Sequence, residues 1–311
     1  MTSVLVTGGA GFIASHFINI LAERHPEYKI VNLDKLDYCS NLNNVREGVS
    51  TFVKGDIKNR DLVAFLIKEF DFDIVFHFAA QSHVDNSFGD PIQFTVDNVL
   101  GTHVLLHVSH EYGRLQKFIH ISTDEVYGEV GPGETSCERS LLNPTNPYAA
   151  SKAAAEFLVR SYGHSFNFPW IITRGNNVFG PRQYPEKLIP KFINHIENGQ
   201  PCTVHGDGET RRNFIYVDDV SSALQVILER GALNRFYNIG TCNEFSVLEI
   251  FKKLARPGAT MVHVPDRPFN DSRYCVDSRP LMALGWREEV PFDEAIKRTV
   301  IWYTENKDWW P

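Results

Sequence analysis

The chain has 311 residues, with 31 Lys and Arg against 38 Asp and Glu, so its formal net charge is −7. This length suits one large α/β domain or two closely joined lobes, and 43% hydrophobic with 22% charged residues argue against intrinsic disorder. Because the chain is acidic and contains no Lys/Arg run, we expect no nucleic-acid partner.

The cysteines and the first residues indicate the compartment. Five scattered cysteines without a C-x-x-C pair fit neither a disulfide framework nor a zinc site, so we expect no metal and a reducing compartment. The first 22 residues lack a basic start, and glycines and polar residues interrupt their apolar stretch. We therefore predict a cytoplasmic protein with no membrane partner.

Short apolar strands alternate with helical patterns through the first half of the chain. We expect strands at residues 3–7, 29–34, 51–54, 74–78, 117–122 and 170–173. Helices are expected over about 12–24, 59–70, 96–112 and 148–162. Repeated alternation of this kind predicts an α/β fold, in which helices cover both faces of a Rossmann-like, doubly wound parallel sheet.

Proline and glycine become more frequent after residue 174, which predicts a smaller C-terminal α/β lobe. Asp218 and Asp219 are expected to cap a helix over 220–228, and a strand at 236–239 is expected to return to the main sheet. We place the first domain at residues 1–175, with return segments around 213–240, and the second lobe mainly at residues 176–311.

A glycine-rich turn follows the first strand and begins the first helix. Gly8 permits a tight turn, and Gly11 lets the backbone approach a pyrophosphate at the helix N-terminus. Asp34 ends the second strand at about the 20-residue spacing expected of a carboxylate that holds ribose hydroxyls. An acid there disfavours a 2′-phosphate, so the pattern predicts NAD rather than NADP. The alternative is a turn that only packs a helix against a strand.

The next two strand ends also face the expected cofactor, because parallel sheets bind ligands at the carboxyl ends of their strands. Asp56, followed by Ile57, is placed to accept a hydrogen bond from the adenine amino group. Ala79 and Ala80, after Phe78, leave room for the backbone beside the cofactor. By itself, Asp56 is more typical of an ordinary turn or helix cap.

Tyr148 and Lys152 stand four residues apart, on one helical face, directly after Pro147. A phenol has a pKa near 10, but an ammonium and a cationic nicotinamide ring both favour the phenolate. Tyr148 is therefore a candidate base. Alone, this spacing usually marks a solvated helix face; downstream of a dinucleotide turn it indicates a redox site.

Asp124 and Glu125 follow Thr123 at the end of a central strand. A regular strand would point them to opposite faces, so both can address one substrate only if the chain leaves the strand there. Two carboxylates in a closed site can hold different protonation states, as the elimination of water requires. The alternative is solvated charge or a helix cap.

These motifs, above all Thr-Asp-Glu-Val-Tyr-Gly at 123–128, resemble the nucleoside-diphosphate-glucose 4,6-dehydratases of the extended short-chain dehydrogenase/reductase family over nearly the whole chain. Segments at 34–41, 77–87, 174–181, 184–191 and 266–271 are similar to dehydratase motifs, and several of these, with the segment at 302–310, look closest to the UDP-glucose enzymes of rhamnose synthesis. Gly175 stands where dTDP-glucose enzymes of bacteria usually have Ser. Both nucleotide sugars are therefore open as substrates.

The resemblance implies a role for each matching residue. Thr123 would bond the reacting hydroxyl beside Tyr148 and Lys152, with Asp124 as general acid and Glu125 as general base. Further cofactor contacts would come from Phe12, Ile13, Lys35 and Ser122. The nucleotide sugar would contact Ser82, His83, Asn177, Lys187, Leu188, Arg212, Arg267 and Asn270, whereas Arg211 is expected to form a surface ion pair.

The implied reaction oxidises C4 of the sugar, eliminates water across C5 and C6, and returns the hydride to C6, as a step of deoxysugar biosynthesis. A 4-epimerase or decarboxylase of the same family would not need Asp124 and Glu125. A non-catalytic NAD-binding sensor would not need Tyr148 and Lys152. The family's usual homodimer is also expected.

Overall fold

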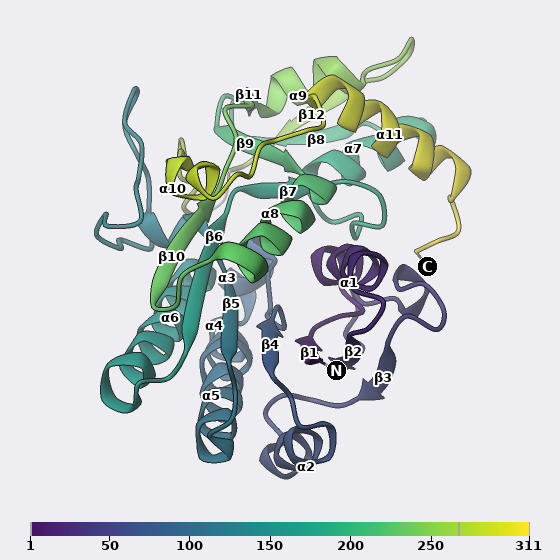
Figure 1. Cartoon of the computed structure of the whole chain (residues 1–311). Helices are drawn as coiled ribbons and strands as arrows, with labels where there is room; N and C mark the ends of the chain where they lie inside the picture. The colour runs from purple at the N-terminus through teal and green to yellow at the C-terminus, as the bar shows by residue number, and fades with distance from the viewer. Residues whose placement is uncertain (1, 267, 311) are drawn as a thin grey trace.

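A seven-stranded parallel sheet forms the centre of the computed structural model, which describes residues 2–266 and 268–310 (Figure 1). Its order is β10-β6-β5-β4-β1-β2-β3. The strands are β1 (Ser3–Thr7), β2 (Lys29–Asp34), β3 (Thr51–Lys54), β4 (Ile74–His77), β5 (Lys117–Thr123), β6 (Trp170–Gly175) and β10 (Arg235–Ile239). The direction of strand addition reverses between β1 and β4, and ligands bind beyond the carboxyl ends at such a point. The predicted fold class is confirmed.

Helices cover both faces of this sheet because its strands are apolar on both sides. Val4 and Val6 pack in one cluster with α1 (Phe12–Arg24) and α8 (Val217–Arg230). Leu5 packs on the opposite face with α2 (Arg60–Phe70), α5 (Gly101–Tyr112) and α6 (Pro147–Phe166). The strand alternation therefore assigns each helix to a layer.

The helix expected over 96–112 is interrupted. Residues Thr95–Leu100 form a π-helical segment, η2, between α4 (Pro91–Phe94) and α5, and the short helix α3 (Val84–Gly89) precedes them. Wider turns of this kind change the direction of side chains and are frequent at functional sites. Here Asp97 and Asn98, both buried, lie in the segment.

The second lobe has its own core around Phe179, Phe192, Ile250 and Ile296. Its strands form a three-stranded sheet, β11-β9-β7, and a two-stranded sheet, β12-β8. These are β7 (Asn177–Phe179), β8 (Cys202–His205), β9 (Arg211–Tyr216), β11 (Glu244–Ser246) and β12 (Met261–Val264). The accompanying helices are α7 (Leu188–Glu197), α9 (Val247–Leu254) and α11 (Phe292–Glu305). The short helix α10 (Arg279–Ala283) instead packs on the main sheet, since its Leu281 belongs to the cluster of Val4 and Val6, and short η1 (Leu42–Asn44) lies in the first domain.

Two expectations for the second half have different outcomes. The returning strand is confirmed, since β10 pairs in parallel with β6. The predicted cap of α8 is wrong, because Tyr216 is the N-cap residue and Asp218 and Asp219 lie in the first turn. Asp219 instead accepts the backbone N–H groups of Glu289 and Val290, at 2.8 and 3.3 Å, and so anchors the C-terminal segment.

The division at residues 175 and 176 stays a prediction. Within the expected return range, β9 pairs with β7 and β11 rather than with the main sheet. Among the residues that the structure describes, no helix combines the length and apolar character needed to cross a bilayer.

Candidate active site

A pocket of about 350 Å³ follows the carboxyl ends of the central strands and reaches the second lobe. This volume lies within the range of roughly 300–1,000 Å³ that is usual for ligand pockets. It is lined by every residue predicted to contact the cofactor: Gly8, Gly11, Phe12, Ile13, Asp34, Lys35, Asp56, Ile57, Phe78, Ala79, Ala80, Ser122, Tyr148 and Lys152. Thr123, Asp124 and Glu125 line the same pocket.

The glycine turn is shaped for close backbone approach. Gly8 has a φ of +72°, and a Cβ atom there would lie 2.8 Å from the backbone of Ala79. Glycine is therefore required for both its conformation and its size. Gly11 is the N-cap of α1 in extended conformation, so the first N–H groups of the helix point toward the pocket.

Asp34 fixes the rim of this turn. Its carboxylate, 5% exposed, accepts the backbone N–H of Ala10 at 3.0 Å and that of Leu36 at 2.7 Å. Burial raises the pKa of Asp34, and these hydrogen bonds oppose that rise. Oδ1 also accepts the Ser40 hydroxyl at 3.2 Å. Each carboxylate oxygen has two acceptor positions, so Oδ2, which accepts only Ala10, keeps capacity for a ribose.

Asp56 has a contact that the sequence argument did not foresee. Its carboxylate accepts the backbone N–H of Lys58 at 2.9 Å and pairs with the Lys58 ammonium at 3.3 Å. The turn interpretation of Asp56 is thus correct, and the residue also lines the pocket. Its predicted hydrogen bond to adenine stays a prediction.

Tyr148 and Lys152 lie on α6, which begins at Pro147 as predicted. Lys152 is 4% exposed, its ammonium donates to the Ile121 carbonyl at 2.7 Å, and burial lowers its pKa to about 8. Burial and the Glu125 carboxylate raise the pKa of Tyr148, while a hydrogen bond with Thr123 lowers it. The protein by itself therefore favours the phenol, in contrast to the phenolate expected from the nearby ammonium.

Asp124 and Glu125 leave β5 through a short helical turn, η3 (Asp124–Tyr127), which Thr123 caps. This confirms the expected departure from the strand. The Asp124 carboxyl, 2% exposed, accepts the amide N–H of Asn176 at 2.7 Å and the hydroxyl of Thr123 at 3.2 Å. Burial raises its pKa to about 7, against the effect of the Asn176 bond.

Glu125 has a different neighbour. It accepts the amide N–H of Asn146 at 3.0 Å, and burial raises its pKa from the ordinary value. Both carboxyl groups therefore gain a proton more readily than a solvated acid, and each has a separate amide donor. Such a pair can hold one acid and one base at neutral pH.

The two asparagines were not among the predicted site residues. Asn146 had a detectable signal, because Asn before Pro marks a helix start, and its Oδ1 does accept the Ala149 N–H at 2.8 Å. Asn176 had none, since its neighbour Asn177 is the same residue type. Only the structure shows that Asn176 contacts Asp124 whereas Asn177 lines the pocket.

The residues predicted to bind the sugar nucleotide fall into two groups. Ser82, Asn177, Lys187 and Leu188 line the pocket, and the Lys187 ammonium donates to the Ser82 carbonyl at 2.7 Å. This bond joins the turn after β4 to the second lobe. These four positions are consistent with the predicted contacts.

The second group, His83, Arg212 and Asn270, is not part of the pocket lining. Arg212 donates to the Asn270 side chain at 3.0 Å and lies 4.7 Å over the Tyr274 ring, and its charge lowers the pKa of Asp124. His83 is 4.0 Å from the Glu186 carboxylate. Predicted Arg267 lies outside the described residues.

The neighbouring Arg211 forms the ion pair expected of it. Its guanidinium lies 3.0 Å from Glu249 and 3.5 Å from Glu244, which belong to the second lobe. Arg212 and Arg211 therefore differ in role although they are adjacent in sequence.

Comparison with known proteins identifies a family for most of the chain. The family model described as GDP-mannose 4,6 dehydratase matches residues 5–299. The chain is 50% identical to the trifunctional UDP-glucose 4,6-dehydratase/UDP-4-keto-6-deoxy-D-glucose 3,5-epimerase/UDP-4-keto-L-rhamnose-reductase of Arabidopsis thaliana, over 99% of this chain and 48% of that protein. It thus spans about half the length of this relative.

Two further proteins are similar over most of their length. The dTDP-D-glucose 4,6-dehydratase of Bos taurus is 49% identical, over 99% of this chain and 90% of that protein. The crystal structure of the dTDP-glucose 4,6-dehydratase DesIV from Streptomyces venezuelae, with NAD bound, has a TM-score of 0.93 and 37% identity, covering 99% of each chain.

Proposed function

We propose, from the premise that this chain belongs to the GDP-mannose 4,6-dehydratase family, that it is an NAD-dependent nucleotide-sugar 4,6-dehydratase, a hydro-lyase. Its substrate would be UDP-glucose or dTDP-glucose, and its products the 4-keto-6-deoxy sugar nucleotide and water. The observation that carries the proposal is the position of Asp124 and Glu125. Both line the pocket that contains Tyr148 and Lys152, and each has its own amide donor.

The pocket fits NAD at its glycine turn. The space beside Gly8 that a Cβ atom would fill, the helix N-terminus at Gly11 and the carboxylate of Asp34 match a pyrophosphate and a ribose. When bound, NAD⁺ accepts a hydride from C4 of the sugar and later returns it to C6. The solved neighbour with NAD bound supports this assignment.

Tyr148 would take the proton of the C4 hydroxyl, with Thr123 orienting that hydroxyl. Burial and Glu125 oppose the phenolate in the protein alone, so Tyr148 needs positive charge beside it to act as a base. Lys152 supplies part of this charge, because its ammonium is held at the Ile121 carbonyl beneath the pocket.

The carboxyl pair would carry out the elimination. Once C4 is a ketone, the C5 proton is acidic and Glu125 removes it. Asp124, whose pKa is raised to about 7, donates its proton to the C6 hydroxyl as this group leaves as water. A group with that pKa is both protonated in useful amounts and able to release its proton at neutral pH.

The test is incubation of the purified chain with UDP-glucose and, separately, with dTDP-glucose. A 4,6-dehydratase yields a 4-keto product that absorbs in alkali, and the ratio of the two rates identifies the nucleotide. Formation of a 4-epimer without a ketone would show an epimerase, and no turnover of either sugar would favour a sensor.

Glu125→Gln sharpens this test in D₂O. We expect C4 oxidation to persist, while exchange of the C5 proton with solvent falls by about 10²-fold or more, the usual contribution of a general base. Exchange of the C5 proton at the wild-type rate in this variant would show that Glu125 is not the base that removes it. Glu129→Gln, at an exposed position beyond η3, is the matched control.

Two finer properties are also proposals. A homodimer is supported by apolar side chains left exposed on neighbouring helical segments, namely Ile92, Leu100 and Phe157. Sedimentation of the purified chain tests it, and a monomer at micromolar concentration would contradict it.

A cytoplasmic location is supported by the scattered free thiols.

A further inference from the structure

Two lysines whose charge is neutralised by carboxylates lie at the cofactor end of the pocket, Lys35 in its lining and Lys58 behind the lining residues Asp56 and Asp97. Lys35 follows Asp34 and lines the pocket, and Lys58 follows the third strand. Ammonium groups so close to a ribose-binding carboxylate are of the type that binds a phosphate on that ribose. Whether the site accepts NADP therefore depends on what holds these lysines.

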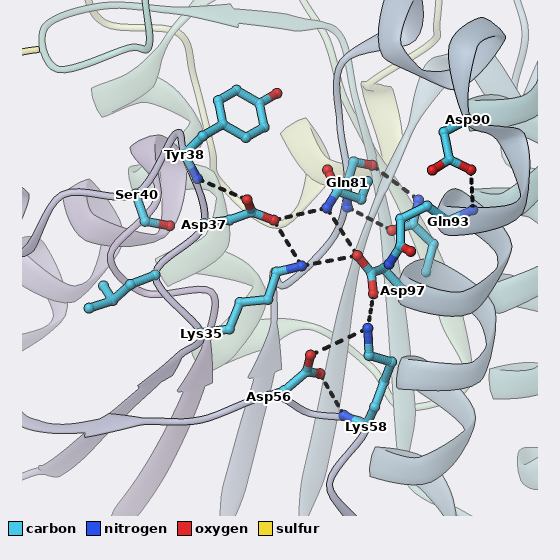
Figure 2. Close-up of polar contacts among 12 residues, drawn as sticks. Lys35, Asp37, Tyr38, Ser40, Asp56, Lys58, Gln81, Asp90, Gln93 and Asp97 are labelled. Atoms are coloured by element: carbon cyan, nitrogen blue, oxygen red, sulfur yellow. Dashed lines mark hydrogen bonds and ion pairs between the residues drawn. The ribbon is translucent and has the colours of Figure 1, made fainter. Parts of the chain in front are cut away.

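Asp97 holds both of them (Figure 2). Its Oδ2 atom accepts the Lys35 ammonium at 3.0 Å, and its Oδ1 atom accepts that of Lys58. Asp37 accepts a second N–H of the Lys35 ammonium, with an ammonium-to-carboxylate distance of 2.8 Å, and Asp56 pairs with Lys58 at 3.3 Å. Two of the three N–H donors of each lysine thus point at carboxylates.

Hydrogen bonds from neighbouring side chains hold Asp97 in position. It lies in the π-helical segment, and its side chain is 8% exposed. The Gln81 amide bridges Asp97 and Asp37, with both distances at 3.0 Å. The adjacent Asn98 bonds the Gln81 backbone at both its N–H and C=O, and donates to Ser151 at 2.8 Å. Asp97 cannot easily turn away from the lysines.

We propose that Asp97 determines cofactor specificity: by binding Lys35 and Lys58 it keeps them from a 2′-phosphate and so excludes NADP. The inference rests on the proposed function, since it assumes a nicotinamide dinucleotide in this pocket. It adds a second determinant to Asp34, from a different element and at a position that does not itself need to touch the ribose.

The charges support this assignment. Three carboxylates, Asp37, Asp56 and Asp97, pair with two ammonium groups, and Asp34 lines the same pocket, so this end is net negative and repels a phosphate dianion. Burial would raise the pKa of Asp97, but hydrogen bonds from Lys58 and Gln81 lower it well below the usual range. Asp97 therefore stays ionised at every pH at which the protein would be assayed.

The experiment measures binding rather than turnover. Protein freed of nucleotide is titrated calorimetrically with NAD⁺ and with NADP⁺ for the wild type and for Asp97→Asn. We expect the ratio of the two dissociation constants to move toward NADP⁺ by about tenfold or more, because Lys35 and Lys58 each regain a free donor. A ratio within twofold of wild type would overturn the proposal.

Asp90→Asn is the matched control, since Asp90 caps α4 and its side chain contacts neither lysine. Asn caps a helix about as well as Asp, so this variant removes the same charge without freeing a cation. If the ratio of the dissociation constants shifted equally in Asp90→Asn, the effect would come from the net charge of the protein rather than from Asp97. Adding Lys35→Met to Asp97→Asn should cancel most of the gain; a full gain in the double variant would also contradict the proposal.

Failure of the proposed function has a different signature. If the wild type binds neither dinucleotide, the cofactor assignment fails. If it binds NAD⁺ and the ratio of the dissociation constants does not respond to Asp97→Asn, only this inference fails.

If Asp97→Asn gives no folded protein, Asp37→Asn is titrated instead. Asp37 is one third exposed and bonded to Lys35, so we expect a smaller shift of about two- to threefold, and no shift would overturn the proposal.

Discussion

The two ends of the pocket use the same residue type in opposite ways. Asp97, at the proposed cofactor end, and Asp124, at the proposed sugar end, are nearly equal in burial, at 7% and 2% exposed. Yet the pKa of Asp97 is lowered and that of Asp124 is raised to about 7. The difference comes from the neighbours, because Asp97 contacts two ammonium groups whereas Asp124 contacts an amide and a hydroxyl.

Burial alone therefore does not decide what a carboxyl group does. A buried carboxylate that is paired with cations, like Asp97, stays charged and can determine which ligand binds. A buried carboxyl group that has only neutral hydrogen-bond donors, like Asp124, is close to half protonated at neutral pH and can donate a proton. The two kinds of carboxyl group lie at different places in the pocket. In the part of the chain that the structure describes, no lysine is bonded to Asp124.

The largest effect should come from removing the proton that Asp124 carries. Asp124→Asn keeps the shape and the hydrogen-bonding capacity toward Asn176 but cannot protonate a leaving hydroxyl. We expect dehydration to slow by about 10²–10⁴-fold, the usual contribution of a general acid. In D₂O, exchange at C5 should continue, since Glu125 is intact.

The readout is the rate of 4-keto product formation, compared with C5 exchange by mass spectrometry in the same sample. Loss of exchange together with dehydration would mean that the two carboxyl groups do not have separate roles. Asp97→Asn, tested in parallel, should leave the two rates in proportion to each other because it lies at the other end.

A smaller effect should appear in the pH dependence. Since Asp124 must be protonated and its pKa is about 7, the first-order rate of elimination should fall about tenfold for each pH unit above that value. On the acid side, the rate should fall as Glu125 gains a proton, at a pH above the ordinary value for Glu because burial raises its pKa.

Single-turnover measurements over pH 5–9 test this profile. In Asp124→Asn the alkaline limb should disappear while the acid limb remains. An alkaline limb that persists in the variant would assign it to another group.

Much of this site could be predicted because its signals are local. The glycine turn, Asp34 and the order of strands and helices follow from spacing and periodicity, and Pro147 marks the start of the helix that carries Tyr148. Asp124 and Glu125 were identified by their position at a strand end, and the structure confirms the turn that brings both into the pocket.

What could not be predicted depends on contacts between distant segments. Asn176 reaches Asp124 across 52 residues, and Asp97 reaches Lys35 across 62. A regular helix was expected over 96–112, and only its wider π-helical turn places Asp97 and Asn98 as observed. The balance of charges that favours the Tyr148 phenol likewise required three-dimensional neighbours.

The smallest effects should be on stability, and they should have opposite signs at the two ends. Asp124 has a raised pKa in the folded state, so the stability it contributes below its unfolded pKa is lost as pH rises toward about 7. Asp124→Asn has no charge to bury. We therefore expect its free energy of unfolding, relative to that of wild type, to be higher at pH 8 than at pH 5 by on the order of 2 kcal/mol.

Asp97 has a lowered pKa, so its contribution to stability is present above its unfolded pKa and is lost only as pH falls through the folded value. Asp97→Asn should therefore melt below wild type at pH 8. Calorimetric scans of both variants at pH 5 and pH 8 measure this, and shifts of the same sign at pH 8 would contradict the distinction between the two carboxyl groups.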